Sequence, residues 1–292
     1  MANQDSLSVR VDASLRASID VALAASTPPR LAEAIRFAVF PGGGRLRPYL
    51  TLAIAEACGD GDPALANAFA AGVELMHCAS LVHDDMPCFD DANLRRGRPT
   101  VHRVFGDATA LLVGDGLIVL ALETIARAAV AARSPQRALR LVTLLAEAAG
   151  PTRGLVAGQA WELEDHAAIE AYHRAKTVAL FEAATAGGAI AAGADEEEWR
   201  ELGRRLGEAY QIADDIADAT CHPAQIGKPV GQDDAHARPN AVREHGLEEA
   251  RARLRHGVDA ALRSLPGSAE VEPLRQWLSG AIGTSLLGLV AA

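Results

Sequence analysis

The sequence has few aromatic residues and few cysteines, and each shortage excludes a class of protein. Phe, Tyr and Trp together make up 4% of the 292 residues, and these are also residues that favour strands. The four cysteines form no CxxC pair and have no zinc-ligand spacing; they are Cys58, Cys78, Cys88 and Cys221. This pattern is typical of free thiols in a reducing cytosol and not of a disulfide framework or a zinc site.

Positive charge is also scarce. Lys and Arg total 28 against 38 Asp and Glu, which gives a formal net charge of −10. A chain of this charge is a poor candidate for binding nucleic acid, because it could not neutralise phosphates over a broad surface. Lysine occurs only twice, at Lys176 and Lys228, and all other basic residues are arginine.

Long apolar runs are missing too. The N-terminal residues contain no basic segment followed by an apolar one, so they do not predict a secretory signal. No uninterrupted apolar run approaches 18 residues, and the longest candidate, LLVGDGLIVLAL, contains Asp115. We therefore expect a cytoplasmic protein without a membrane span.

The residues that are abundant predict an all-α fold. Apolar residues make up 49% of the chain, alanine alone is about a fifth of it, and apolar positions recur at helical spacing. Asp62-Pro63 and Ser134-Pro135 each place a capping side chain before a proline, a pattern typical of helix starts. No linker or internal repeat divides the sequence. We expect one domain over 1–292, a helical bundle around a deep central cavity.

A first cluster of charge lies in HDDMPCFDDANLRRGRP, residues 83–99. Four aspartates follow a strongly apolar helical segment, so their carboxylates should lie at the end of a buried helix. Two carboxylates about 4 Å apart repel by roughly 4 kcal/mol at an effective dielectric of 20. A divalent cation removes this repulsion, and ligands that are all oxygen favour Mg²⁺. The alternative is a solvated acidic helix end.

A second acidic cluster lies in GEAYQIADDIADAT, residues 207–220. In a helix, Gln211, Asp215 and Asp218 fall on one face at i, i+4 and i+7, and Asp214 and Asp218 are four residues apart. The neighbouring residues are again apolar. Two such motifs facing each other across a bundle would hold several Mg²⁺ ions and, through them, a polyphosphate.

Basic residues accompany the irregular stretches of the chain. Arg45 and Arg47 lie in a glycine-rich segment, Arg95 and Arg96 follow the first acidic cluster, and both lysines stand beside candidate phosphate loops. Guanidinium forks suit phosphate oxygens, and lysine supplies a compact charge.

These motifs together resemble the trans-isoprenyl diphosphate synthases, the farnesyl and geranylgeranyl diphosphate synthase family. The segments that carry the resemblance are FPGGGRLRP, ELMHCASLVHDD, DDMPCFD, RRGRP, GQAWELE, AKTVALFEAA, QIADDIAD and IGKPVGQD. Several of them look most like bacterial geranylgeranyl diphosphate synthases of pigment pathways. The resemblance implies a Mg²⁺-dependent head-to-tail prenyl transfer between isopentenyl diphosphate and an allylic diphosphate, performed by a homodimer.

The resemblance also implies roles for individual residues. The implied Mg²⁺ ligands are Asp84, Asp90, Asp214 and Asp218. The implied contacts of the allylic diphosphate are Arg95, Lys176 and Lys228, while Thr177 and Gln211 would stabilise the carbocation. Isopentenyl diphosphate would be held by Arg47, His77 and Arg96. Asp84, Asp90, Lys176 and Asp214 are the expected catalytic residues, and the departing diphosphate would accept the proton.

Two positions leave alternatives open. On a straight helix Asp84 and Asp90 would point about 240° apart, whereas Asp91 would align with Asp84. Asp90 is chosen on the resemblance, and Pro87 could distort the helix to bring it inward. Gly44 stands where the family usually has a lysine, so Arg45 or Arg47 would have to compensate, or the chain could be a non-catalytic subunit.

The length of the product can also be argued. The growing chain should run along the helix that carries Asp84, past Ser80, Ala79 and Met76. Relatives that make farnesyl diphosphate often have an aromatic residue at the position of Ala79. The small side chain therefore predicts a C20 product, geranylgeranyl diphosphate, with C15 as the alternative; Ala79 could also be a small core residue at a helix crossing.

Overall fold

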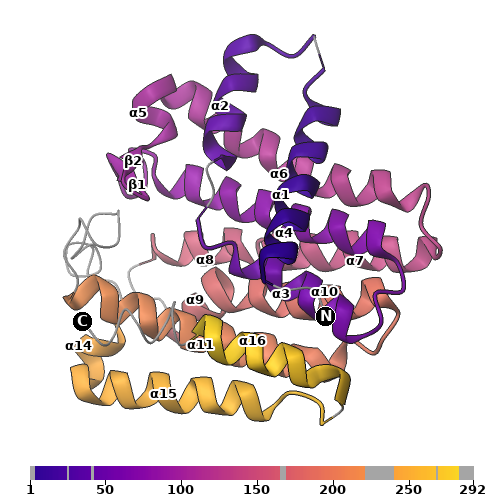
Figure 1. The fold of residues 1–292 in the computed structure, drawn as a ribbon. Coiled ribbons are helices and arrows are strands. Elements are labelled where there is room, and N and C mark those ends of the chain that lie inside the picture. Colours follow the sequence, from indigo (N-terminus) through magenta and orange to yellow (C-terminus); the bar gives the residue numbers. More distant parts are fainter. Residues whose placement is uncertain are drawn as a thin grey trace. The chain divides into compact units, whose positions relative to one another are not determined.

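The computed structural model describes residues 4–24, 26–40, 43–164, 169–220, 240–267 and 269–282. Within them the fold is all-α apart from two strands of two residues each, as the composition predicted (Figure 1). The chain divides into two compact units: residues 1–146 with 187–194, and residues 147–186 with 195–292. The expectation of one domain over 1–292 stays a prediction, and each unit is described by itself.

Unit 1 is built on long helices and one short hairpin. Its elements are α1 (Gln4–Ala22), α2 (Pro29–Val39), α3 (Leu46–Ala57), α4 (Pro63–Asp84), β1 (Leu94–Arg95), β2 (Arg98–Pro99), α5 (Val101–Phe105), α6 (Asp107–Ala129), most of α7 (Pro135–Ala149) and the end of α10 (Ala179–Ala192).

Helix α4 forms the core of unit 1 and packs most extensively against α6. It begins as its sequence predicted: the side chain of Asp62 accepts a hydrogen bond from the Leu65 N–H at 3.2 Å, and Pro63 follows this cap. The two helices approach closely at Gly72, where a β carbon would lie 2.9 Å from the Ala121 carbonyl oxygen. The acidic motif at the end of α4 is thus attached to a rigid, buried helix.

Both α4 and α6 are long and apolar enough, by length and composition, to cross a membrane. Core helices of soluble proteins pass the same test, and 78% of the apolar window of α4 is buried inside the fold. The corresponding share for α6 is 44%. Helix α6 therefore keeps much of its apolar surface uncovered within its unit.

Unit 2 contains the second acidic motif. Its elements are α8 (Leu155–Trp161), α9 (Ile169–His173), the π-helix η1 (Arg174–Val178), the start of α10, α11 (Glu197–Thr220), α14 (Ala241–His245), α15 (Leu247–Arg263), the 3₁₀ helix η2 (Ala269–Val271) and α16 (Glu272–Ile282). Helix α11 packs on α15 and on η1. The contact with η1 is close: a β carbon at Gly207 would lie 2.8 Å from the α carbon of Val178.

Candidate active site

The first acidic motif lies in a turn and not in a distorted helix. Helix α4 ends at Asp84, before Pro87, and the chain then folds back so that the Asp90 N–H donates to the Asp84 carbonyl oxygen at 3.0 Å. The straight-helix angle between these two residues therefore does not apply, because the helix has already ended. The backbones of the two predicted ligands are neighbours in this turn.

Asp91 differs from Asp90 in its surroundings. Its backbone has a φ of 45°, in the left-handed region, and its largely exposed carboxylate lies 3.7 Å from His102 Nε2. A left-handed non-glycine residue costs about 1–2 kcal/mol, so the turn is held by its other contacts. The choice of Asp90 as a metal ligand stays a prediction.

The carboxylate of Asp85 is paired with an arginine. Arg95 donates from Nε and Nη2 to one carboxylate oxygen of Asp85, at 2.9 and 2.6 Å. The pKa of Asp85 is raised to about 6, because burial, helped by the negative charges of Asp84 and Asp90, outweighs the lowering effect of Arg95. Arg95, predicted to bind the allylic diphosphate, thus lies beside the acidic turn and is paired with a carboxylate. The three aspartates are close enough to repel one another.

A two-residue turn explains the position of the adjacent arginine. Arg95 and Arg98 pair across the antiparallel strands β1 and β2, and the turn between them has positive φ at Arg96 (54°) and Gly97 (73°). Two successive left-handed residues are typical of a type I′ turn, which needs glycine at one position. The turn presents Arg96 next to the glycine-rich segment, where a β carbon at Gly43 would overlap its guanidinium.

The predicted isopentenyl diphosphate residues are brought together within unit 1. Arg47 is buried in the first turn of α3, and His77 lies on α4. Burial lowers the pKa of His77 well below its usual range, and the positive charges of Arg47, Arg96 and Arg95 lower it further. His77 is therefore neutral at pH 7 and can act as a hydrogen-bonding group but not as a cation. The substrate roles of these residues stay predictions.

A buried carboxylate among these cations was missed by the sequence analysis. Glu74 lies one helical turn before His77 and is 1% exposed. Burial raises its pKa, while the charges of Arg96, Arg45 and Arg47 oppose that rise. The signal was present in the sequence, since a glutamate inside an otherwise apolar helix is rarely buried without partners.

In unit 2, Lys176 and Thr177 lie in the π-helix η1. Single π turns inside helices are frequent at functional sites, because the extra residue re-aims neighbouring side chains. Gly158, in the GQAWE segment on α8, packs directly on this turn: its β carbon would lie 2.5 Å from both the N and Cα atoms of Lys176.

The lysine is held by residues of the same unit. Its Nζ forms a short ion pair with Glu162, whose side chain is 3% exposed, and the Tyr172 hydroxyl donates to the same carboxylate oxygen at 2.6 Å. Glu162 follows directly after α8. Lys176 is thus positioned by a buried carboxylate in the GQAWE segment.

A second hydrogen-bonded chain connects η1 to α11. The Thr177 hydroxyl donates to Gln211 Oε1 at 2.6 Å, and Gln211 Nε2 donates to Asp215 Oδ1 at 2.8 Å. The other oxygen of Asp215 accepts from the Ala241 N–H at 2.8 Å. The structure therefore brings Thr177 and Gln211 together, with Asp215 as their buried support, and their role toward a carbocation stays a prediction.

Asp214 and Asp218 lie on the half-buried side of α11, four residues apart, in contrast to Asp215, which is 1% exposed. Within the described ranges, no group of three or more His, Cys, Asp or Glu side chains is arranged to hold a metal ion. Lys228, the remaining predicted contact of the allylic diphosphate, lies outside the described residues.

The chain was compared with known proteins. Residues 28–276 match the polyprenyl synthetase family. The chain is 55% identical over 257 residues to a geranylgeranyl diphosphate synthase of Cereibacter sphaeroides, covering 88% of each chain. It is 46% identical over 274 residues to a geranylgeranyl diphosphate synthase of Rhodobacter capsulatus, covering 93% of this chain and 94% of the other.

The solved structures agree in fold. A geranyltransferase from Helicobacter pylori, crystallised with magnesium and isoprenyl diphosphate, superposes with a TM-score of 0.77 at 26% identity and covers all of both chains. The identity and coverage of these relatives, together with the family match, show the family and the type of enzyme. The chain belongs to the polyprenyl synthetase family and is a trans-prenyltransferase.

Proposed function

We propose that this prenyltransferase makes geranylgeranyl diphosphate by adding isopentenyl diphosphate to an allylic diphosphate, with farnesyl diphosphate as the C15 starter. The observation that carries the proposal is the 55% identity, over 88% of the chain, to a geranylgeranyl diphosphate synthase. The side chain of Ala79 on α4 is small and buried, and we take this position as the one where an aromatic ring would block the growing chain.

The cations of the site would bind the two diphosphates. We propose that Lys176 and Arg95, with Lys228, hold the allylic diphosphate. Arg47, Arg96 and the neutral His77 would hold isopentenyl diphosphate and orient its double bond. The pairs Arg95–Asp85 and Lys176–Glu162 support this view, since each holds a cation in a fixed position before substrate arrives. Such fixed charges stabilise a leaving group without the cost of reorganisation.

The aspartates fit Mg²⁺ in their donor chemistry. Asp84 and Asp90 offer carboxylate oxygens at adjoining ends of one turn, and their charges already raise the pKa of Asp85. Asp214 and Asp218 offer two more on α11. Mg²⁺ is bound by a few carboxylates completed by substrate phosphates, so these four residues suffice without a closed protein cage. Bound Mg²⁺ would neutralise the diphosphate oxygens and so favour their departure.

The remaining groups serve the carbocation. The allylic C–O bond breaks with its electron pair going to the diphosphate, the isopentenyl double bond forms the new C–C bond, and a proton is then lost to the departed diphosphate. The oxygens of Thr177 and Gln211, fixed by Asp215, would face the positive charge as dipoles. No separate side-chain base is required by this scheme.

We also propose a homodimer that pairs through α6. Leu111, Leu112 and Val119 on this helix are 48%, 57% and 64% exposed. Leu112 and Val119 lie two turns apart on one face of the helix, with Asp115 and Gly116 between them, and a second copy of the chain can cover these apolar side chains. Light scattering after gel filtration is expected to give twice the mass of 30.5 kDa; a monomer at micromolar concentration would contradict the pairing.

The function is tested by incubating the purified chain with Mg²⁺, labelled isopentenyl diphosphate and either farnesyl or a shorter allylic diphosphate, followed by sizing of the products. We expect label in a C20 diphosphate. Label in C15 alone would identify a farnesyl diphosphate synthase. No incorporation from any starter would favour a non-catalytic subunit that modulates an active partner.

A further inference from the structure

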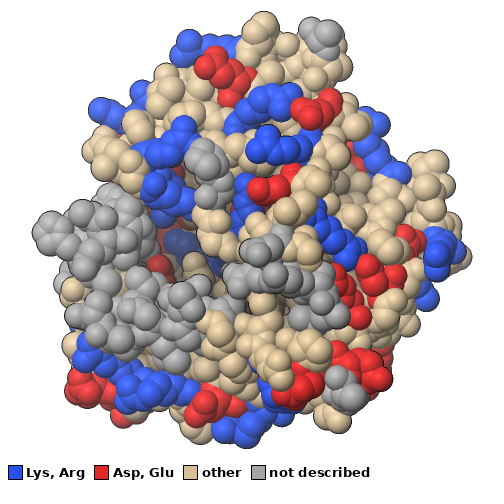
Figure 2. Space-filling view, in the orientation of Figure 1, with Lys and Arg blue, Asp and Glu red and all other residues tan. Residues whose placement is uncertain are grey.

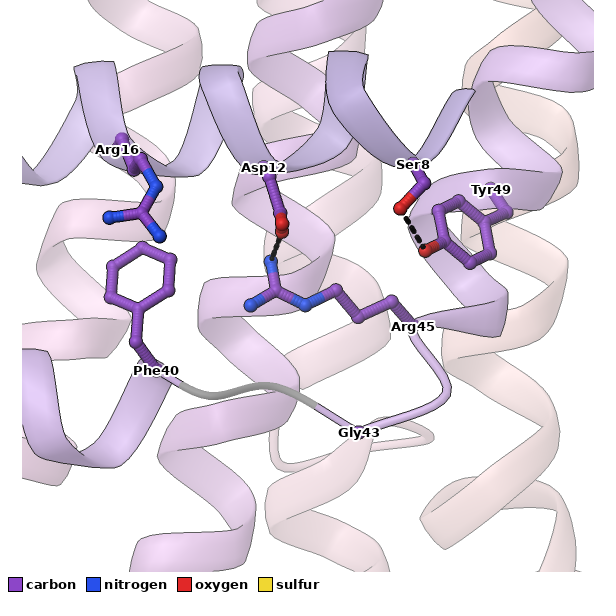
Figure 3. Close-up of a pocket in the computed structure, with 7 residues that line it drawn as sticks. All are labelled: Ser8, Asp12, Arg16, Phe40, Gly43, Arg45 and Tyr49. Atoms are coloured by element: carbon purple, nitrogen blue, oxygen red, sulfur yellow. Dashed lines mark hydrogen bonds and ion pairs between the residues drawn. The ribbon is translucent and has the colours of Figure 1, made fainter. Parts of the chain in front are cut away.

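Beside the glycine-rich segment, unit 1 has a pocket of about 510 Å³, and of its lining residues only Arg45 has a predicted role (Figure 3). It lies between α1, the segment after α2 and the first turn of α3. Its lining residues are Ser8, Asp12, Arg16, Phe40, Gly43, Arg45 and Tyr49. A volume of this size accommodates a small ligand.

Three of these side chains come from one stripe of α1. Ser8, Asp12 and Arg16 are spaced four residues apart and therefore lie above one another on the helix. The neighbouring stripe, which includes Leu7 and Leu15, is buried in the core. The packing of α1 thus fixes which polar side chains line the pocket.

The charges of the pocket do not cancel. Arg45, which is 6% exposed, pairs with Asp12 at 2.8 Å, so these two residues neutralise each other. Arg16 is exposed and lies with its guanidinium 4.7 Å from the centre of the Phe40 ring. Among the described residues, Arg16 forms no ion pair. The pocket therefore carries one excess positive charge, on a guanidinium held in place by stacking.

The pocket adjoins the arginines predicted to bind isopentenyl diphosphate. Gly43 lines it and also packs on the guanidinium of Arg96. Gly44, the next residue, has open space where a side chain would be. Blue side chains gather on the same face of the molecule, over α1, α2 and the β1–β2 hairpin (Figure 2). Gly43 therefore links Arg96 to the pocket that Arg16 lines.

We propose that Arg16 is a binding residue for the diphosphate group in this pocket. Resting on the function proposed above, the ligand is the diphosphate of isopentenyl diphosphate, with the released inorganic diphosphate as the other source of the same chemistry. A guanidinium donates up to two parallel hydrogen bonds to phosphate oxygens, and the Phe40 ring beside Arg16 offers no hydrogen-bond acceptor of the carboxylate kind that would compete for them. Residue 16 lies before residues 28–276, the stretch that matches the family.

The test is steady-state kinetics of Arg16→Ala with farnesyl diphosphate saturating. We expect the KM for isopentenyl diphosphate to rise about tenfold, the loss typical of one charge-assisted contact. The kcat and the KM for farnesyl diphosphate should stay within twofold. Arg36→Ala is the matched control, because Arg36 is another exposed arginine of unit 1 but is paired with Asp20 at 2.8 Å; it should leave both KM values unchanged.

A second variant tests whether the lost affinity comes from the missing positive charge and not from a change in structure. Lysine at position 44 enters open space in the same segment, so Gly44→Lys added to Arg16→Ala should restore most of the lost affinity for isopentenyl diphosphate. An unchanged KM in Arg16→Ala would overturn the proposal. So would an equal rise of both KM values together with a lower melting temperature, because that result indicates a structural role for Arg16 through Phe40.

Equilibrium binding distinguishes isopentenyl diphosphate from inorganic diphosphate as the ligand. It also tests the proposal when the chain has no measurable activity. Calorimetric titration of isopentenyl diphosphate and, separately, of inorganic diphosphate into wild type and Arg16→Ala needs no turnover. Weaker binding of isopentenyl diphosphate alone supports the substrate, and weaker binding of both supports a shared diphosphate site. Equal affinities in the two proteins would overturn the proposal even if the chain proved inactive.

Discussion

The π turn that carries Lys176 depends on the absence of a side chain at Gly158, and replacing this glycine measures how precisely the lysine must be placed. In Gly158→Ala the new β carbon would lie 2.5 Å from the backbone N and Cα of Lys176, whereas ordinary contact begins at 3.4 Å. Both partners are backbone atoms, so no flexible side chain can move aside. One helix must therefore shift by about 1 Å, a misplacement that can reduce catalysis about 100-fold.

The assay is incorporation of labelled isopentenyl diphosphate at saturating substrates, below the melting temperatures of all variants. We expect kcat to fall about 100-fold in Gly158→Ala. The control is Gly257→Ala on α15 of the same unit, where the added carbon would meet Ala209 Cβ at an ordinary 3.6 Å. This variant should keep the wild-type kcat. A wild-type kcat in Gly158→Ala would refute the argument that the close packing of α8 positions the lysine.

Three further predictions concern the product, a thiol and a buried carboxylate. Ala79→Phe should change the main product from C20 to C15 in a product-sizing assay, because the ring would fill space beside α4; an unchanged distribution would mean that Ala79 only packs the core. Burial raises the pKa of the Cys78 thiol to about 12, so the thiol stays protonated at pH 8. Peptide mass spectra should therefore show iodoacetamide on the exposed Cys88 and not on Cys78. Equal labelling in the folded protein would contradict this. Asp215→Asn should lower the free energy of unfolding by about 1–3 kcal/mol in urea titrations. The buried carboxylate now accepts hydrogen bonds from two donors, and an amide would place an N–H group or a weaker acceptor opposite them. A free energy of unfolding equal to that of the wild type would show that Asp215 is not a structural support.

The fold class and the spacing of polar residues within single helices could be predicted from sequence, because both follow from local pattern, whereas the grouping of residues from different elements rested on the family resemblance. Alanine and leucine at helical spacing gave helices, and the side chain before Pro63 caps α4 as expected. The spacing of Gln211 and Asp215 on one helix face is likewise observed as a hydrogen bond. These features depend on residues a few positions apart in one helix.

The features that sequence could not provide depend on contacts between elements. The end of α4 at Asp84, and the turn that returns Asp90 to it, replaced the expected helix distortion at Pro87. The π turn at Lys176 has no signature of its own, since RAKTV reads as ordinary helix, and it becomes understandable only from the close approach of Gly158.

The carboxylates that pair with Arg95 and Lys176 could not be predicted from the sequence either. Asp85 is one of four aspartates within eight positions, and nothing in their order showed that it would pair with Arg95. Glu162 was recognisable only as part of the GQAWE segment, and its contact with Lys176 joins the end of α8 to η1. Such pairs are set by packing between different elements and not by helical period.

We propose that the two aspartate motifs bind Mg²⁺ together with an allylic diphosphate. Crystals can be grown with Mn²⁺, as a substitute for Mg²⁺, and a non-hydrolysable farnesyl diphosphate analogue, and anomalous diffraction then locates the metal. We expect metal peaks within coordination distance of Asp84 and Asp90, and of Asp214. Peaks ligated by Asp91 in place of Asp90 would correct the ligand set, and a bound diphosphate without metal at either motif would contradict the claim.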